Sequence, residues 1–261
     1  MTNQQTNTVT FDTASLEEMG LKQTGAVRHG INEEFRAIKH EVLKHAFPRD
    51  RAAANKNRVL VTSVNEGDGK TFCAFNLAMS VSLEADKNVL LVDTNILSPS
   101  LHKMVAPKPK VGLLDYISEA LVSTQDIIHH TDKDNLKIIT VSDNNEYANE
   151  CLSSNTMVEL AGEFNSRYND RLVIFDAPPL LGVNETATLA ENVDQIIIVV
   201  ADGKVKESDL KIIQKKIPEH VVVHYVLNKT PKGRDWKKNS QTDNNAFTET
   251  DKALTGSSAL N

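Results

Sequence analysis

Six short runs of apolar residues, separated in several places by segments with a helical pattern, constrain the fold of this chain more than any other feature. The runs read RVLVTSV from Arg58, NVLLVDT from Asn88, LKIITVS from Leu136, RLVIFDAP from Arg171, QIIIVVAD from Gln195 and VVVHYVLN from Val221. Near-continuous Val, Ile and Leu suit strands that are covered on both faces, as the strands of parallel sheets are. Helical patterns occupy residues 71–85, 156–167, 185–192 and 208–216. This alternation predicts an α/β fold with a mainly parallel sheet flanked by helices.

The two ends of the chain differ in composition from its middle. Residues 1–30 are rich in Thr, Asn and Gly, and we expect them to be flexible. Residues 31–46 place Ile31, Phe35, Ile38 and Val42 at helical spacing, which predicts an amphipathic helix at the start of a domain covering residues 31–230. Residues 231–261 have too few apolar groups to offset the entropy of ordering, so we expect a disordered polar tail.

Composition argues against several classes of function. The formal net charge of -6 disfavours a dedicated nucleic-acid binder, because phosphate neutralisation needs a basic face. No apolar run approaches the roughly 20 residues that span a bilayer, and the polar first residues do not resemble a signal peptide. Cys73 and Cys151 match no metal-ligand spacing and favour a reducing compartment. We therefore expect a cytoplasmic protein without a membrane span of its own.

The segment VTSVNEGDGKT, residues 61–71, joins the first apolar run to a helical pattern and has the features of a phosphate-binding loop. Gly67 and Gly69 allow the backbone to approach phosphate oxygens without a Cβ in the way. Lys70 would reach the β- and γ-phosphates, and the Thr71 hydroxyl would bind Mg²⁺. The strict pattern requires glycine where this chain has Val64. The alternative is a simple glycine-rich turn, but the order of strand, Gly-x-Gly-Lys-Thr and helix favours a nucleotide site.

Four acidic residues bear on this site. Glu66 and Asp68 lie in the turn, where they disfavour an anion unless they point outward. Asp93 and Asp176 each end an apolar run, which places them at the carboxyl edge of the predicted sheet, where open α/β sheets bind ligands. Taken singly, either acid is more typical of a strand end or a helix cap. Together, behind a phosphate loop, they predict a site for Mg²⁺ or its bound water.

Three segments taken together resemble one family. TSVNEGDGKTFCAFNLA, VLLVDTNILSPSLH and LVIFDAPPLL are similar to the Walker A, Walker A′ and Walker B motifs of bacterial tyrosine kinases (BY-kinases). These kinases belong to the MinD/ParA-like group of P-loop NTPases, whose fold the resemblance implies for residues 30–230. Walker A in this family often reads T-S-x-x-P-G-E-G-K-[ST], so the absent first glycine is tolerated. The phrase INEEFRAIK is especially close to tyrosine autokinases of exosortase-linked exopolysaccharide clusters.

The resemblance implies a protein-tyrosine kinase that uses ATP and Mg²⁺. It implies catalytic roles for Lys70, Asp93 and Asp176, with Asp93 assisting deprotonation of the tyrosine hydroxyl. Asn228 matches the asparagine that reads adenine, although without the family it would be interpreted as a strand-ending turn residue. The implied metal site is Thr71, Asp93, Asn95 and Asp176. The implied nucleotide site is Glu66, Gly67, Asp68, Gly69, Lys70, Thr71, Phe72 and Asn228.

The chain also departs from the family pattern. Walker A′ commonly has a second acid where this chain has Asn95, which brings no charge to a metal site. BY-kinases usually phosphorylate tyrosines in a C-terminal tail, whereas the last tyrosine here is Tyr225. The MinD and ParA branch carries an early loop lysine where this chain has Asn65, which favours the kinase branch. The alternative to a kinase is a nucleotide-switched regulatory or partitioning-type ATPase with weak or no kinase activity.

The resemblance also implies partners. Glu33, Arg36 and Lys39 look like the family's E-x-x-R-x-x-R motif, which implies a homo-oligomer formed through the helix at residues 31–46. The alternative for this helix is that it merely covers the sheet. The family further implies a membrane chain-length determinant, or polysaccharide co-polymerase, that recruits the kinase to the inner face of the membrane.

Overall fold

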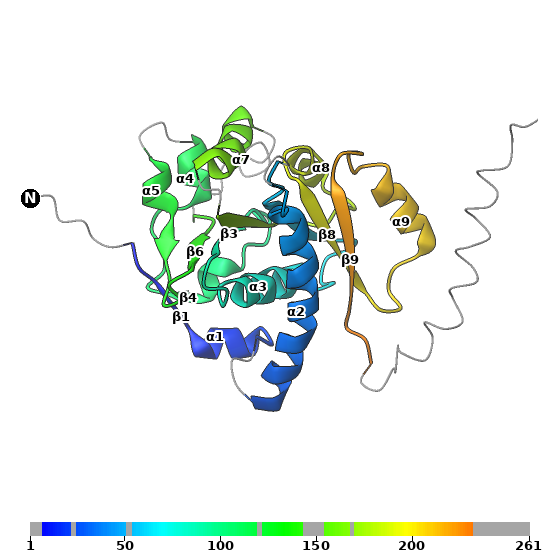
Figure 1. Ribbon diagram of the computed structural model, residues 1–261, viewed down its shortest axis with the longest axis horizontal. Helices are drawn as coiled ribbons and strands as arrows, with labels where there is room; N and C mark the ends of the chain where they lie inside the picture. Colours follow the sequence, from blue (N-terminus) through cyan, green and yellow to red (C-terminus); the bar gives the residue numbers. More distant parts are fainter. Residues whose placement is uncertain are drawn as a thin grey trace, which may run out of the picture. The chain divides into compact units, whose positions relative to one another are not determined.

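The apolar runs of the sequence form the strands of one sheet. The computed structural model describes residues 7–21, 25–50, 54–118, 122–142, 154–167 and 170–231. Within these residues the sheet has seven strands in the order β5-β6-β3-β7-β2-β8-β9 (Figure 1). Neighbouring strands are parallel except β5 and β6, which are antiparallel. The strands are β2 (Arg58–Ser63), β3 (Asn88–Asp93), β5 (His129–His130), β6 (Leu136–Ile139), β7 (Arg171–Asp176), β8 (Gln195–Ala201) and β9 (Val222–Asn228).

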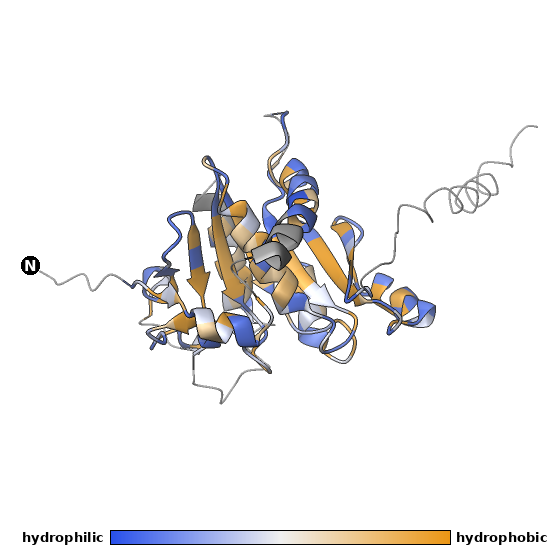
Figure 2. Cartoon of the chain, turned by 90° about the horizontal axis from the view of Figure 1, so that it is seen from below, coloured by the Kyte–Doolittle hydropathy of each residue, from blue (hydrophilic) through white to orange (hydrophobic). Residues whose placement is uncertain are grey.

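Helices cover both faces of this sheet, as near-continuous apolar strands require. One apolar cluster joins the sheet to α2 (Gly25–Ala46) and α3 (Lys70–Val81), through buried side chains that include Phe35, Val42, Phe75, Leu91 and Ile174. A second cluster joins the other face to α7 (Asn155–Arg167), α8 (Asn184–Ala190) and α9 (Glu207–Gln214). Most strands are hydrophobic in Figure 2. The predicted α/β fold with a mainly parallel sheet is confirmed.

Shorter elements complete the fold. They are α1 (Thr13–Glu18), α4 (Leu113–Ser118), α5 (Thr124–Ile127), the 3₁₀ turn η1 (Leu101–Lys103) and the small antiparallel pair β1 (Thr10–Phe11) and β4 (Val105–Ala106). Because they are too short for a periodic pattern, the sequence did not indicate them.

The N-terminal segment is more ordered than its composition predicted. Residues 7–21 form β1 and α1, and Val9, Leu16 and Leu21 are almost fully buried. The Asp12 carboxylate accepts a hydrogen bond from the Ser15 amide and caps α1. The expectation of a flexible segment over residues 1–30 was therefore wrong for residues 7–21, because three apolar anchors suffice to hold a polar segment against the domain. The long helix α2 also begins at Gly25, before the predicted start at residue 31.

Among the described residues, those up to Asn228 belong to one compact unit, and residues 229–231 belong to a second. The tail predicted for residues 231–261 thus lies almost wholly outside the described residues. Among the helices that the structure describes, none combines the length and the apolar character needed to cross a bilayer.

Candidate active site

The loop between β2 and α3 has the conformation that a phosphate-binding loop needs. Gly67 and Gly69 have φ angles of 78° and 105°, which L-residues with a Cβ rarely adopt. Within the described residues no side chain caps the first turn of α3, so its free N–H groups and positive dipole end remain available to an anion. Lys70, the first residue of α3, is only 8% exposed.

Val64 replaces the first glycine of the strict motif for a packing reason. Its side chain is fully buried in the apolar cluster that also contains Leu60, and its amide donates to the Val199 carbonyl of β8 at 3.3 Å. Valine therefore anchors the start of the loop to the sheet. The departure from the motif leaves the glycines that approach the phosphates unchanged.

The two acids of the loop behave differently. Glu66 is exposed, as an anion site requires. Asp68 is 2% exposed, and its carboxylate accepts a hydrogen bond from the Asn65 amide at 2.9 Å. The Asp68 side chain thus stabilises the turn from within, whereas only Glu66 points outward as expected.

Asp93 and Asp176 are brought side by side at the ends of β3 and β7. They are direct partners in the parallel register of these strands, and Asp176 is also the register partner of Val61 in β2. Both carboxylates are fully buried. Lys70 begins α3 directly after the loop that follows β2, and β2 is the neighbour of β7 in the sheet. The three residues predicted to be catalytic therefore lie at the same edge of the sheet.

The carboxylate of Asp93 organises the loop that follows β3. One oxygen accepts from the Asn95 amide at 3.1 Å, and the other accepts from the amides of Ser100 and Leu101, each at 3.0 Å. Burial raises the pKa of Asp93 to about 6, and these three amides oppose the rise. The same loop borders a cavity of about 370 Å³ lined by residues 97–99, 102, 103, 141 and 142.

Asp176 has no such support. Neither of its carboxylate oxygens has a hydrogen-bond partner at normal length among the described residues, although the nearby Thr71 hydroxyl lowers its pKa. Burial, together with the neighbouring charge of Asp93, raises the pKa of Asp176 to about 8. A buried carboxylate without partners is costly unless a cation or proton joins it. This environment, with the Thr71 hydroxyl alongside, fits Mg²⁺, which binds through one or two carboxylates plus phosphates and water.

The remaining predicted residues are placed as follows. Asn95 is 3% exposed, and its side-chain amide donates to the Ser98 carbonyl at 2.8 Å, so it holds the same loop as Asp93. The Phe72 ring packs against Phe35 of α2, with ring centroids 6.1 Å apart, which leaves only its backbone for a nucleotide. Within the described residues, no three His, Cys, Asp or Glu side chains are grouped to hold a metal. A Mg²⁺ ion here would therefore depend on the nucleotide's phosphates for part of its coordination.

Asn228 ends β9 next to the phosphate loop rather than in open solvent. Its Nδ2 atom donates a hydrogen bond to the Asp68 carbonyl at 2.9 Å. A Cβ added to Gly69 would lie 2.1 Å from the same nitrogen. The sequence pattern identified Asn228 only through the family resemblance, and it could not reveal this contact.

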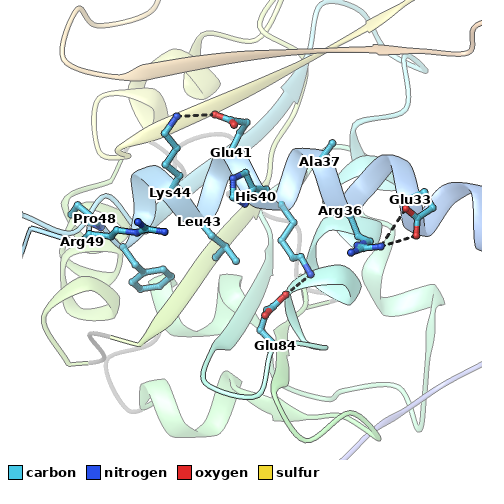
Figure 3. Close-up of a pocket in the computed structure, with 12 residues that line it drawn as sticks. Glu33, Arg36, Ala37, His40, Glu41, Leu43, Lys44, Pro48, Arg49 and Glu84 are labelled. Atoms are coloured by element: carbon cyan, nitrogen blue, oxygen red, sulfur yellow. Dashed lines mark hydrogen bonds and ion pairs between the residues drawn. The ribbon is translucent and has the colours of Figure 1, made fainter.

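The three residues of the predicted oligomerisation motif on α2 point in two directions. Arg36 pairs with Glu33 on the exposed side of the helix at 3.0 Å. Lys39 instead pairs with Glu84 and donates to the Ser80 carbonyl at 3.3 Å, so it is engaged within its own domain. These residues line an open groove of about 1260 Å³ along α2 (Figure 3), well separated in sequence from the phosphate loop.

Comparison with known proteins gives this geometry a context. The chain is 29% identical over 176 residues to the tyrosine-protein kinase YwqD of Bacillus subtilis. The aligned region covers 67% of this chain and 70% of YwqD. It is 34% identical over 146 residues to EpsB of Ralstonia solanacearum, and this aligned region covers 56% of this chain and 19% of EpsB. The relatives of this chain are bacterial tyrosine-protein kinases. No family model matches the chain.

Solved structures show that the fold is shared with BY-kinase domains and MinD. The kinase domain of Escherichia coli tyrosine kinase Etk superposes with a TM-score of 0.65 at 19% identity, covering 87% of this chain and 92% of that domain. MinD of Pyrococcus horikoshii, solved as a complex with Mg-ADP, superposes with a TM-score of 0.56 at 18% identity, covering 68% of this chain and 72% of MinD. At these identities the likeness establishes the MinD-like P-loop fold alone.

Proposed function

We propose that this chain is an ATP- and Mg²⁺-dependent protein-tyrosine kinase domain that regulates exopolysaccharide biosynthesis or export. The observation that carries the proposal is the placement of Lys70, at the end of a glycine loop that opens α3, at the same sheet edge as two buried acids, Asp93 and Asp176. The names of its relatives support a kinase: YwqD is a tyrosine-protein kinase, and a Klebsiella pneumoniae relative is named for the cps region.

The residues suit phosphoryl transfer, which depends mostly on positioning and charge neutralisation. The loop amides and Lys70 would hold the triphosphate and offset charge on the transferred group. Bound Mg²⁺ would supply further neutralisation, held by Thr71 and Asp176. A tyrosine hydroxyl attacks the γ-phosphorus, the bond to the β-phosphate oxygen breaks and ADP leaves. Asp93 accepts the hydroxyl proton, and its pKa of about 6 suits that task near neutral pH.

The tyrosines of the given sequence bear on which acceptor the kinase would use. No tyrosine follows Tyr225, which is 49% exposed on β9. Tyr116 lies in α4, and Tyr147 and Tyr168 lie outside the described residues. The cavity beside the Asp93-bound loop offers room for an acceptor side chain from another protein or another copy of this chain.

The test is phosphotyrosine mass spectrometry of purified protein incubated with Mg·ATP and a tyrosine-containing acceptor. Lys70→Ala should reduce phosphotyrosine at least about 100-fold, because a buried charge that stabilises the transition state is lost. Lys215→Ala, which removes an exposed lysine after α9, should leave the signal unchanged. Full activity in the Lys70→Ala protein would overturn the proposal.

A second candidate function is a nucleotide-switched ATPase that regulates the same machinery without phosphorylating protein. Asn95 at the second Walker A′ position and the MinD-like fold favour this alternative. Absence of phosphotyrosine, together with an ATP-dependent change of oligomeric state, would select it.

We also propose that the chain assembles with itself through the exposed face of α2 and works beside a membrane chain-length determinant at the inner face of the membrane. The support is the outward Glu33–Arg36 pair and the open groove on this helix.

A further inference from the structure

The contact between Asn228 and the phosphate loop joins two parts of the chain that are 160 residues apart. The Nδ2 atom of Asn228 donates to the Asp68 carbonyl at 2.9 Å, immediately before Gly69 and Lys70. The opposite side of the same turn is held by the Asp68 carboxylate, which accepts from the Asn65 amide. Asp68 is therefore fixed through its side chain and through its main chain, and only the second bond comes from outside the loop.

Two features of the structure disfavour a side chain at position 69. Its φ of 105° disfavours any residue with a Cβ. A Cβ would also stand 2.1 Å from Asn228 Nδ2 and 3.4 Å from its Cγ, and the first distance is impossible without displacing the asparagine. The glycine thus admits the Asn228 side chain as well as a phosphate.

Asn228 is itself held firmly by the sheet. It is the register partner of Ala201 in β8, and its carbonyl accepts from the Asp202 amide at 2.9 Å. The neighbouring strand β8 also accepts the Val64 amide at the start of the loop. The last two strands therefore contact the loop at both its beginning and its end.

We propose that Asn228 is a positioning residue that fixes the Asp68–Lys70 backbone for phosphate binding, instead of reading the adenine base. This inference rests on the proposed nucleotide site. One of the two N–H donors that a base-reading asparagine could offer to adenine is engaged by the loop in this structure. An asparagine that positions the loop must change the affinity for every ligand with a triphosphate group, whatever base is attached.

The binding experiment measures Mg·ATP, Mg·GTP and magnesium tripolyphosphate by calorimetry on wild type and Asn228→Ala. We expect affinity for all three to fall by a similar factor, roughly three- to tenfold, the loss expected for one hydrogen bond. The ratio of ATP to GTP affinity should stay constant. Asn192→Ala, which removes a side-chain amide that donates to the Thr188 carbonyl of α8, should change nothing. A loss confined to ATP, with tripolyphosphate unaffected, would overturn the inference.

A second experiment tests the contact without any nucleotide. Thermal unfolding is measured for Gly69→Ala, Asn228→Ala and the double variant. Because the Asn228→Ala protein lacks the atom that Gly69→Ala would strike, the second substitution should cost less stability in that background. Additive losses would show that the two residues do not touch and would overturn the inference. If wild type binds none of the three ligands, the proposed nucleotide site fails, and this cycle still decides whether Asn228 positions the loop.

Discussion

At the scale of single residues, two acids with the same burial have different roles. Asp93 and Asp176 are register partners on adjacent strands, yet Asp93 is surrounded by three amides whereas Asp176 has no partner at normal hydrogen-bond length among the described residues. Amide donors favour the charged form of a carboxylate, and burial without donors disfavours it. The pKa accordingly rises to about 6 for Asp93 and to about 8 for Asp176. Asp93 thus stabilises the loop that follows β3, and Asp176 is the acid whose charge a bound cation would stabilise more.

This difference predicts a pH dependence of stability in the nucleotide-free protein. The pKa of Asp176 is raised from 3.8 to about 8, so the folded state binds a proton more tightly than the unfolded state. Its stabilising contribution is present below pH 4 and is lost as the pH rises towards 8. Asp176→Asn should remove this loss and raise the melting temperature at pH 8 by roughly 2–4 °C per kcal/mol gained.

Thermal unfolding between pH 5 and pH 8 measures the effect. Glu66→Gln, which neutralises an exposed acid of the phosphate loop, is the matched control and should leave the pH profile unchanged. Parallel profiles for wild type and Asp176→Asn would contradict the prediction. Mg·ADP should raise the wild-type melting temperature most at pH 8 and should do little for Asp176→Asn.

At the scale of elements, the N-terminal segment belongs to the folded domain. The β1–β4 pair and the bond from the Asp12 amide to the Met104 carbonyl tie this segment to η1, whose first residue donates to Asp93. Phe11 also packs edge-on against Phe75 of α3, with ring centroids 5.3 Å apart. The segment therefore braces both the phosphate-loop helix and the Asp93 loop from the same face.

We predict that Leu16→Ala lowers the free energy of unfolding by about 2–5 kcal/mol, the usual loss for truncating a fully buried leucine. Met19→Ala, at the end of the same short helix, should cost under about 0.5 kcal/mol because Met19 is 36% exposed. Urea unfolding followed by far-ultraviolet circular dichroism gives both values. Equal, small losses would indicate that the segment adds nothing to the domain.

At the scale of the whole molecule, the exposed face of α2 is the surface that the proposed assembly would use. Figure 3 shows Glu33 and Arg36 paired on this helix. It also shows Glu84, which follows α3 and pairs with Lys39 of α2. The side chain of Lys39 is only 13% exposed, whereas that of Arg36 is 67% exposed. Of the three motif residues, only Glu33 and Arg36 are thus free to meet a second copy.

We predict that Arg36→Glu lowers the oligomer mass measured by light scattering with Mg·ATP present, because it places two acids together at the interface. Lys39→Ala should keep the wild-type mass and lose about 1 kcal/mol of stability or less, as expected for a partly exposed ion pair. A monomeric wild type, or an unchanged mass for Arg36→Glu, would contradict assembly through α2.

The sequence by itself determined the fold class and the sheet edge at which the candidate site lies. Apolar runs of strand length and the Gly-x-Gly-Lys-Thr turn are local patterns, and parallel strands that end in Asp93 and Asp176 must deliver those acids to one edge. Only the tertiary structure decided which amides Asp93 accepts, why Asp68 turns inward, how Asn228 contacts the loop and that residues 7–21 are held in place. The physical reason is that these features rest on single hydrogen bonds and a few buried side chains between distant segments. Such contacts leave no periodicity in the chain from which they could be predicted.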